Sequence, residues 1–187
     1  TRFGDLYARN RLRGLPTDDV SADMYDVTQE ICDAKGLNAY EISNHARKGA
    51  ECQHNRIYWQ YGDYAGIGPG AHGRLTIDGQ RIATDTPLLP EDWLATVQKN
   101  GSATRNAEKI APSDQAAEYV MMSLRLSEGT NLTRVNEISN HRITQSAMDD
   151  LISDGFLSLQ NNTLTATSRG KMVLNALLGK LLAQDSP

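Results

Sequence analysis

Histidine, aromatic and glycine residues are concentrated in one stretch of the sequence, residues 40–74. Three of the four histidines and five of the eleven aromatic residues lie there. The histidines are His45, His54 and His72, and the aromatic residues are Tyr40, Tyr58, Trp59, Tyr61 and Tyr64. Imidazole can ligate a metal, and flat aromatic rings can pack against a planar ligand. The stretch therefore predicts a ligand-binding site.

The motif His54-Asn55-Arg56-Ile57-Tyr58 is the main candidate within this stretch. A neutral imidazole can ligate a transition metal or a heme iron, and Asn55 can orient it. If the segment is helical, Tyr58 lies one turn from His54 on the same face. Four basic residues near the motif can meet carboxylates: Arg47, Lys48, Arg56 and Arg74. The alternative is that His54 is a hydrogen-bonded structural residue, and the spacing alone leaves both interpretations open.

His45, His72 and Cys52 are weaker candidates. Either histidine can serve as a second ligand or as a base, although a loop or turn role is the commoner one. Cys52 lies two residues before His54, which permits thiolate ligation, but a free thiol is the commoner outcome. The spacing of the remaining residues indicates neither a Ser-His-Asp constellation nor a carboxylate pair.

The glycine-rich segment at residues 66–73 matches GxGxxG from Gly68 onward. A dinucleotide site would require a helix after these glycines, whereas the sequence predicts a hairpin there. We therefore interpret Gly66, Gly68 and Gly70 as a ligand-facing loop, in which the backbone turns sharply or approaches a ligand closely. A purely structural turn is the alternative.

Composition excludes several classes of protein. A length of 187 residues allows a buried core and two units, and a net charge of −4 disfavours general affinity for nucleic acids. The two cysteines, Cys32 and Cys52, form neither a CxxC metal motif nor a disulfide framework, so we expect a reducing compartment.

The sequence predicts a cytoplasmic protein. It contains no run of eighteen apolar residues, hence no transmembrane segment, and its first residues lack a signal-peptide core. The chain starts with Thr inside a charged segment, so we expect it to be the later part of a longer protein.

The first half of the chain predicts one helix, two strands and a hairpin after a basic connection at residues 1–16. Thr17 or Asp18 caps the helix and Gly36 ends it. Its apolar positions have the spacing of an amphipathic helix: Val20, Met24, Val27 and Ile31. Strands are expected at 37–43 and 63–67, separated by a loop of about twenty residues. A hairpin turns at Asp78-Gly79. This order indicates an α/β layer whose loops bind the ligand.

The second half is mainly helical, with helices expected at 91–100 and 113–127. A set resembling a winged helix follows, with helices at 131–140, 143–154 and 168–183 and strands FLSL and TLTA around Asn161-Asn162. The boundary falls near residue 88, giving units 1–88 and 89–187. Three acidic residues on the second of these helices would repel phosphate, namely Asp149, Asp150 and Asp154. We therefore expect a protein-packing or lid role and no nucleic-acid partner.

Several segments resemble the C-terminal half of the HemW-type heme chaperones: YEISN, ECQHNRIYW, YGDYAGIGPGAHG, GFLSL and LTATSRGKMVLNALLGKLL. These chaperones are radical SAM proteins similar to oxygen-independent coproporphyrinogen III oxidase. The resemblance covers nearly the whole chain, and HNxxY followed by Trp and GIGPGAHG is specific. It implies an α/β plus α fold, in which residues 1–88 are the last elements of a partial (β/α) barrel and residues 89–187 form a HemN-type C-terminal helical domain.

The resemblance implies heme binding through His54, Asn55 and Tyr58, with His54 as the candidate iron ligand, and transfer of heme to acceptor proteins. The oxidase branch of the family is expected to lack HNxxY, which favours the chaperone. A coproporphyrinogen III oxidase and a non-catalytic interaction module stay as alternatives. The second axial ligand is left open between His45, His72, water and none, and so is a homodimer.

The family's CxxxCxxC motif is absent from the chain. A [4Fe-4S] cluster of this type needs three cysteines at that spacing, which Cys32 and Cys52 cannot supply. The cluster and S-adenosylmethionine are therefore expected only in the full-length protein, and whether the chain is part of an enzyme is undecided. His45 stands where the family is expected to have an aromatic residue, a smaller departure.

Overall fold

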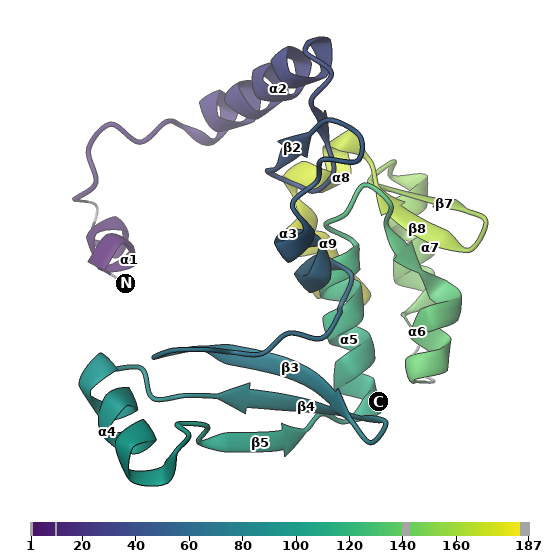
Figure 1. The fold of residues 1–187 in the computed structure, drawn as a ribbon. Helices are drawn as coiled ribbons and strands as arrows, with labels where there is room; N and C mark the ends of the chain where they lie inside the picture. Colours follow the sequence, from purple (N-terminus) through teal and green to yellow (C-terminus); the bar gives the residue numbers. More distant parts are fainter. Residues whose placement is uncertain (1, 10, 140–142, 184–187) are drawn as a thin grey trace.

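The computed structural model describes residues 2–9, 11–139 and 143–183. The described residues form an N-terminal arm of two helices, a three-stranded sheet with one helix at its end, and a C-terminal unit of helices and short strands (Figure 1). The mixed helix and strand content predicted from the sequence is confirmed. Every strand pair in the described ranges is antiparallel. No helix in these ranges is both long and apolar enough to cross a membrane.

The N-terminal arm consists of α1 (Arg2–Ala8) and α2 (Asp18–Ala34). Helix α1 shows that the prediction of a connection without regular structure was wrong for residues 2–8. Helix α2 confirms its predicted start, because the hydroxyl of Thr17 accepts a hydrogen bond from the backbone of Val20 at 3.4 Å. Gly36, just beyond the helix, has φ of 70°, as a helix-ending glycine requires.

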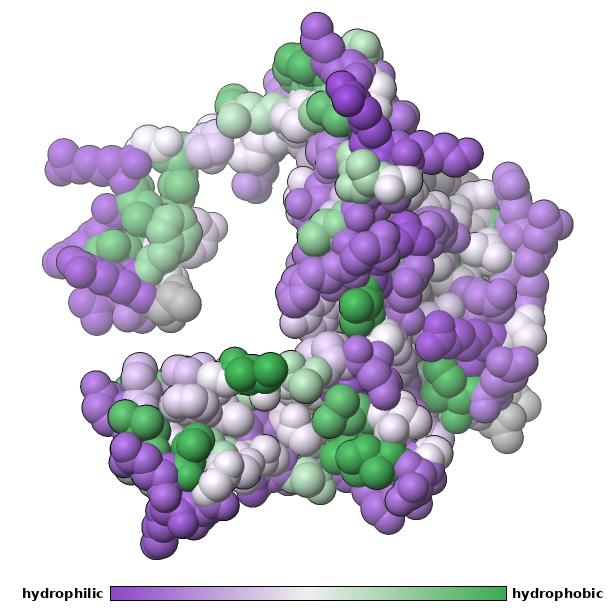
Figure 2. Space-filling view, viewed as in Figure 1, coloured by the Kyte–Doolittle hydropathy of each residue, from purple (hydrophilic) through white to green (hydrophobic). Residues whose placement is uncertain are grey.

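The apolar face of α2 is not covered by the part of the chain that the structure describes. Neither α1 nor α2 has a buried residue. The four apolar residues of α2 are 47–59% exposed: Val20, Met24, Val27 and Ile31. Figure 2 shows hydrophobic residues on the surface of this arm. An amphipathic helix gains most of its stability from packing, so this face has the character of a contact surface.

The two predicted strands at 37–43 and 63–67 are largely wrong. Only β1 (Asn38–Ala39) forms from the first, and it pairs with β2 (His45–Ala46). Strand β1 ends early because the buried carboxylate of Glu41 accepts a hydrogen bond from the backbone of Ser43 and turns the chain. The second segment contributes only one bridge, between Tyr64 and Arg74. The predicted loop between them contains helix α3 (Gln53–Trp59).

The predicted hairpin is confirmed as β3 (His72–Ile77) and β4 (Gln80–Asp85). Asp78 and Gly79 have φ of 50° and 73°, as in the tight turns that favour Asp-Gly. A third strand, β5 (Asn106–Lys109), pairs with β4 and was not predicted, because its residues are exposed and poor in β-branched side chains.

Helix α4 (Pro90–Asn100) connects β4 to β5 and ends at Gly101 with φ of 74°, as predicted. In the sequence, β4 ends before residue 88 and β5 begins after it, yet the two strands pair with each other. The division of the chain at that residue stays a prediction.

The C-terminal unit begins with α5 (Pro112–Ser123), β6 (Thr130–Asn131) and α6 (Leu132–Ile138). It continues with α7 (Gln145–Ser153), β7 (Leu157–Gln160), β8 (Thr163–Ala166), α8 (Ser168–Met172) and α9 (Leu174–Leu181). Its sheet has the order β6-β8-β7.

Two helices of this unit differ in their limits from the prediction. The helix expected at 168–183 is divided at Val173, whose ψ of 22° is outside helical geometry. The helix expected at 131–140 ends at Ile138, because Ser139 is extended with φ of −156° and ψ of 149°, and residue 140 lies outside the described residues.

The main core lies in this unit. Leu124, Leu164 and Leu181 are fully buried, and α5, α7, α9 and the strands β7 and β8 contribute to the same cluster. Tyr61, which lies between α3 and β3, is 7% exposed and joins this cluster. The core therefore includes a residue from the motif-bearing half of the chain.

Glu118 on α5 connects the three-stranded sheet to this core. The hydroxyl of Tyr61 donates to one Glu118 oxygen at 2.7 Å, and Arg74 donates to both oxygens at 3.1 and 2.8 Å. The guanidinium of Arg81 lies 4.3 Å from the centre of the Tyr61 ring. Burial raises the pKa of Glu118, but the hydrogen bonds from Arg74 and Tyr61 outweigh burial and bring the pKa below its ordinary value.

Replacing Glu118→Gln should lower the free energy of unfolding at pH 7 by about 1–3 kcal/mol, because Arg74 loses a charged bidentate partner. Chemical denaturation measures the effect. The matched control is Asp150→Asn, which breaks an exposed ion pair with Lys180 and should cost less than about 1 kcal/mol.

The effect of Glu118→Gln should depend on pH. Since the pKa of Glu118 is lowered in the folded state, its stabilisation is present above the ordinary value of 4.5 and is lost as the pH falls through the lower folded value. The difference between the wild type and the variant should therefore shrink below pH 4.5. A difference that stays constant down to pH 3 would contradict this role of the carboxylate.

Candidate functional site

Helix α3 brings two of the predicted site residues together. The rings of His54 and Tyr58 are one turn apart, with centroids 4.7 Å apart in an edge-to-face arrangement. The ring of Tyr58 in turn lies 4.3 Å from that of Tyr64. His54 is exposed, and the two tyrosines are half-buried. We call His54, Tyr58 and Tyr64 the aromatic row.

The third motif residue, Asn55, points to a different partner. Its side-chain amide donates to the hydroxyl of Tyr40 at 3.1 Å. Two neighbours on α3 contact the C-terminal unit: Arg56 pairs with Glu128 at 2.7 Å, and Arg125 lies 5.5 Å from the centre of the Trp59 ring. One side of α3 therefore holds the helix in place, and another side presents the aromatic row.

The glycine loop that follows is closed by backbone packing. A Cβ atom on Gly66 would lie 2.6 Å from the carbonyl of His72, so the two segments are too close for a side chain. Gly68 accepts a hydrogen bond from the Thr86 hydroxyl at 2.7 Å, and the backbone of Gly70 donates to Pro87 at 2.7 Å. Close packing accounts for glycine at position 66, and the positive φ values of 102° and 66° account for Gly68 and Gly70. The ligand-facing role predicted for Gly66, Gly68 and Gly70 stays a prediction.

The weaker histidine candidates have other surroundings. A ring nitrogen of His45 lies 3.1 Å from the side-chain oxygen of Gln29 on α2. His72 is exposed on β3 and lies opposite Asp85 in the sheet register. Cys52 precedes α3 and is exposed, with a free thiol. A role for His45 or His72 as second ligand stays a prediction.

Two of the four basic residues considered for carboxylate binding already have acidic partners. Arg56 pairs with Glu128, and Arg74 pairs with Glu118. Both guanidinium groups are therefore already engaged by carboxylates of the chain itself. Arg47 and Lys48 are exposed.

The described residues fit some ligands and not others. They contain no group of three or more His, Cys, Asp or Glu side chains placed to hold a metal ion. A single exposed imidazole beside flat rings fits a heme, whose iron takes axial ligands and whose ring system packs on aromatic side chains. The two cysteines of the chain do not fit a [4Fe-4S] cluster, which needs more thiolates.

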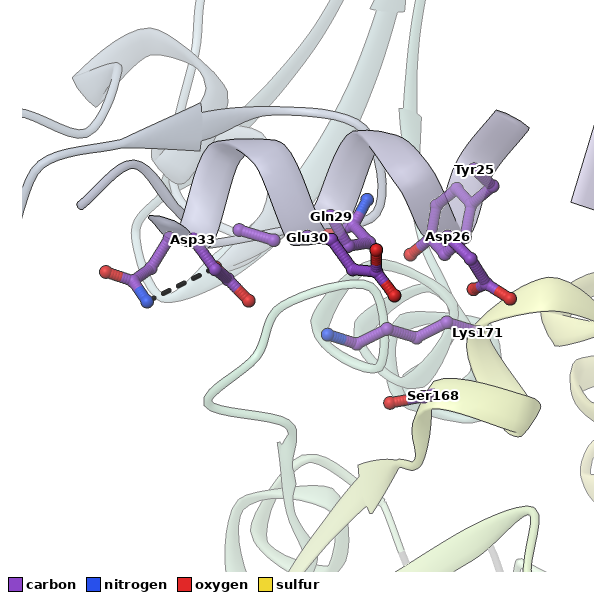
Figure 3. Close-up of a pocket in the computed structure, with 9 residues that line it drawn as sticks. Tyr25, Asp26, Gln29, Glu30, Asp33, Ser168 and Lys171 are labelled. Carbon is purple, nitrogen blue, oxygen red and sulfur yellow. Dashed lines mark hydrogen bonds between the residues drawn. The ribbon is translucent and has the colours of Figure 1, made fainter. Parts of the chain in front are cut away.

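A polar cavity of about 380 Å³ lies between α2 and α8 and includes none of the predicted site residues. Figure 3 shows Asp26 and Glu30 of α2 facing Lys171 and Ser168 of α8. The sequence contains one sign of it, since Asp26, Glu30 and Asp33 share a helix face. Its opposite wall comes from residues more than 130 positions later, which the sequence pattern does not connect to α2.

The chain is similar in sequence to several known proteins. Residues 110–173 match the model of the HemN C-terminal domain. The chain is 32% identical over 175 residues to heme chaperone HemW from Escherichia coli, covering 91% of this chain and 44% of that protein. It is 32% identical over 179 residues to mitochondrial radical S-adenosyl methionine domain-containing protein 1 from Mus musculus, covering 90% of this chain and 40% of that protein.

A third relative, heme chaperone HemW from Bacillus subtilis, is 29% identical, with 98% of this chain and 48% of that protein covered. The chain spans less than half the length of each of these relatives.

A solved structure has a similar fold. The structure of coproporphyrinogen III oxidase (HemN) from Escherichia coli, described as a radical SAM enzyme, superposes with a TM-score of 0.67 over 94% of this chain and 44% of that chain. The sequence identity is 14%, so the likeness concerns the fold alone.

The close packing at Gly66 can be tested by Gly66→Ala, which should lower the free energy of unfolding by about 1–3 kcal/mol because the new methyl group overlaps the backbone of His72. The control is Gly179→Ala on α9, where a Cβ atom meets nothing within 4 Å, and which should be neutral or stabilise by up to about 1 kcal/mol. Urea denaturation measures both. Equal stability of Gly66→Ala and the wild type would show that the loop does not need a glycine there.

Proposed function

We propose that this chain, a relative of the HemW-type heme chaperones with a HemN C-terminal domain at residues 110–173, binds heme and takes part in its transfer to acceptor proteins. The observation that carries the proposal is the aromatic row, which begins on α3 with an exposed imidazole and ends at Tyr64 beyond the helix. The relatives named heme chaperone support the same function, and they match nine-tenths or more of this chain.

In this proposal His54 ligates the heme iron through a ring nitrogen in its neutral form. The edge-to-face contact with Tyr58 restricts rotation of the imidazole, and Tyr58 is itself supported by Tyr64. Heme is the cargo here. The heme propionates meet Arg47 and Lys48, which are exposed near the motif, because Arg56 and Arg74 are already paired.

An exposed ligand suits a cargo that must leave again. His54 is at the surface, so a side chain of an acceptor protein can approach the iron from the open side and replace His54 as its ligand. An enclosed pocket would instead bury most of a ligand's surface and hold it back. The second axial ligand stays open between His45, His72, water and none.

We also propose a winged-helix-like unit in the second half of the chain and a place at the end of a (β/α) barrel for the first half. The order helix-strand-helix-helix-strand-strand from α5 to β8, with the sheet order β6-β8-β7, supports a winged-helix-like unit. The exposed apolar face of α2 supports a place for residues 1–88 at the end of a (β/α) barrel, where such a helix would be covered. The boundary at residue 88 belongs to the same proposal.

The alternative function is a coproporphyrinogen III oxidase. It is favoured by the similarity of the fold to that enzyme, whereas the chaperone is favoured by the relatives at about twice the sequence identity. A radical SAM reaction in either case requires S-adenosylmethionine and a cluster bound outside this chain's two cysteines. Incubating the full-length protein with coproporphyrinogen III separates the two, because only the oxidase forms the decarboxylated product.

We also propose a cytoplasmic location, as the sequence predicts, although the mouse relative is named as mitochondrial. The proposed function needs a heme and an acceptor protein. It requires neither a homodimer nor nucleic acid, and a role as an interaction module alone would leave the aromatic row without a use.

Titration of the chain with ferric heme should give a shifted Soret band, and His54→Ala should weaken binding about tenfold or more, because the iron loses a protein ligand. The control is Gln53→Ala, which changes the neighbouring exposed residue of α3 and leaves the aromatic row intact. Absorption spectroscopy measures both. The assignment of His54 as ligand is wrong if its variant keeps the spectrum and affinity of the wild type.

A further inference from the structure

The turn that follows α5 is a rigid part of the C-terminal unit. It comprises Arg125, Leu126, Ser127 and Glu128, and we call it the 125–128 turn. The backbone amides of Arg125, Leu126 and Gly129 all donate hydrogen bonds within it or to the end of α5, at 3.0–3.2 Å. Leu126 is only 3% exposed. The turn is therefore fixed to the core that lies behind it.

Three residues of the 125–128 turn contact α3 or the strand end beside it. Glu128 accepts a charged hydrogen bond from Arg56 at 2.7 Å. The guanidinium of Arg125 lies 5.5 Å from the centre of the Trp59 ring. Ser127 donates twice to the carbonyl of Tyr40, from its backbone amide and from its hydroxyl, both at 3.1 Å.

Tyr40 joins this turn to the motif. It is 7% exposed, its carbonyl is held by Ser127, and its hydroxyl accepts the side-chain amide of Asn55 at 3.1 Å. A buried side chain whose own backbone carbonyl and hydroxyl are both hydrogen-bonded has little freedom to change its rotamer. Asn55 is adjacent to His54, so the position of Tyr40 bears directly on the orientation of the first turn of α3.

The geometry of α3 separates these contacts from the aromatic row. With about 100° between successive residues of a helix, His54 and Tyr58 share one side, whereas Asn55, Arg56 and Trp59 lie on the side next to it. The contacts made by Asn55, Arg56 and Trp59 thus determine the direction in which His54 and Tyr58 point. Helix α3 has seven residues, too few to hold its orientation without such contacts.

We infer that Tyr40 and Glu128 are positioning residues for the heme site: through them, the 125–128 turn of the C-terminal unit sets the orientation of α3 and thereby that of the imidazole of His54. This inference rests on the proposed function. Neither residue contacts the iron. Loosening either contact leaves the ligand present but allows α3 to turn, so that the iron meets an imperfectly oriented imidazole and binds with weaker, mixed ligation.

The test uses Tyr40→Phe, which removes the hydroxyl but keeps the ring, and Glu128→Gln, which removes the charge but keeps the shape. There are two matched controls. Tyr119→Phe removes the hydroxyl of a buried tyrosine that accepts a hydrogen bond from the backbone of Asn131. Asp150→Asn breaks an exposed ion pair with Lys180. Both test variants should bind heme about 3- to 10-fold more weakly than the wild type. Their electron paramagnetic resonance spectra should show mixed iron spin states, which the controls do not.

A second measurement does not involve heme. Amide hydrogen exchange at residues 53–59 should be faster by about 3- to 10-fold in Tyr40→Phe and Glu128→Gln, because the free energy that holds α3 is reduced, and unchanged in the controls. Exchange in strand β7 (Leu157–Gln160), which carries none of the substituted residues, serves as the internal reference.

The outcomes distinguish the proposed function from the positioning role. Failure of the wild type to bind heme, or no effect of His54→Ala, would refute the proposed function, and the exchange data would still show whether the turn positions α3. Heme binding that depends on His54, with the test variants indistinguishable from the controls in affinity, spectrum and exchange, would overturn the positioning role alone.

Discussion

The carboxylate of Glu118 is the contact on which the arrangement of the molecule depends. It receives a bidentate pair from Arg74 in the sheet and a hydroxyl from Tyr61, while the ring of Tyr61 lies in the hydrophobic core of the C-terminal unit. Charged hydrogen bonds at a partly buried position are worth more than exposed ion pairs. The sheet, the segment after α3 and the C-terminal unit therefore share one set of contacts.

Helix α3 lies between these parts, and its two sides have different tasks. One side is held through Asn55, Arg56 and Trp59, and the other presents His54 and Tyr58. The glycine loop beside it is closed by backbone contacts. A rigid support with an exposed imidazole suits reversible binding of a flat ligand, because the ligand meets a preorganised surface and can leave from it.

The N-terminal arm has the opposite character. Its helices have regular backbone hydrogen bonding and no buried residue, and the apolar face of α2 is exposed. The relatives are more than twice as long as this chain. The cavity between α2 and α8 belongs to the same region, where the arm meets the C-terminal unit across polar side chains.

Local sequence signals determined what depends on neighbours along the chain: the cap at Thr17, the Asp78-Gly79 turn, the helix end at Gly101 and the one-turn spacing of His54 and Tyr58. Such features require only propensity and spacing. Tertiary structure alone decided the pairing of β5 with β4, the closing of the glycine loop and the partners of Arg56 and Arg74. These contacts join positions 18 to 72 residues apart, and no local pattern encodes which charge or strand edge will be near when the chain is folded.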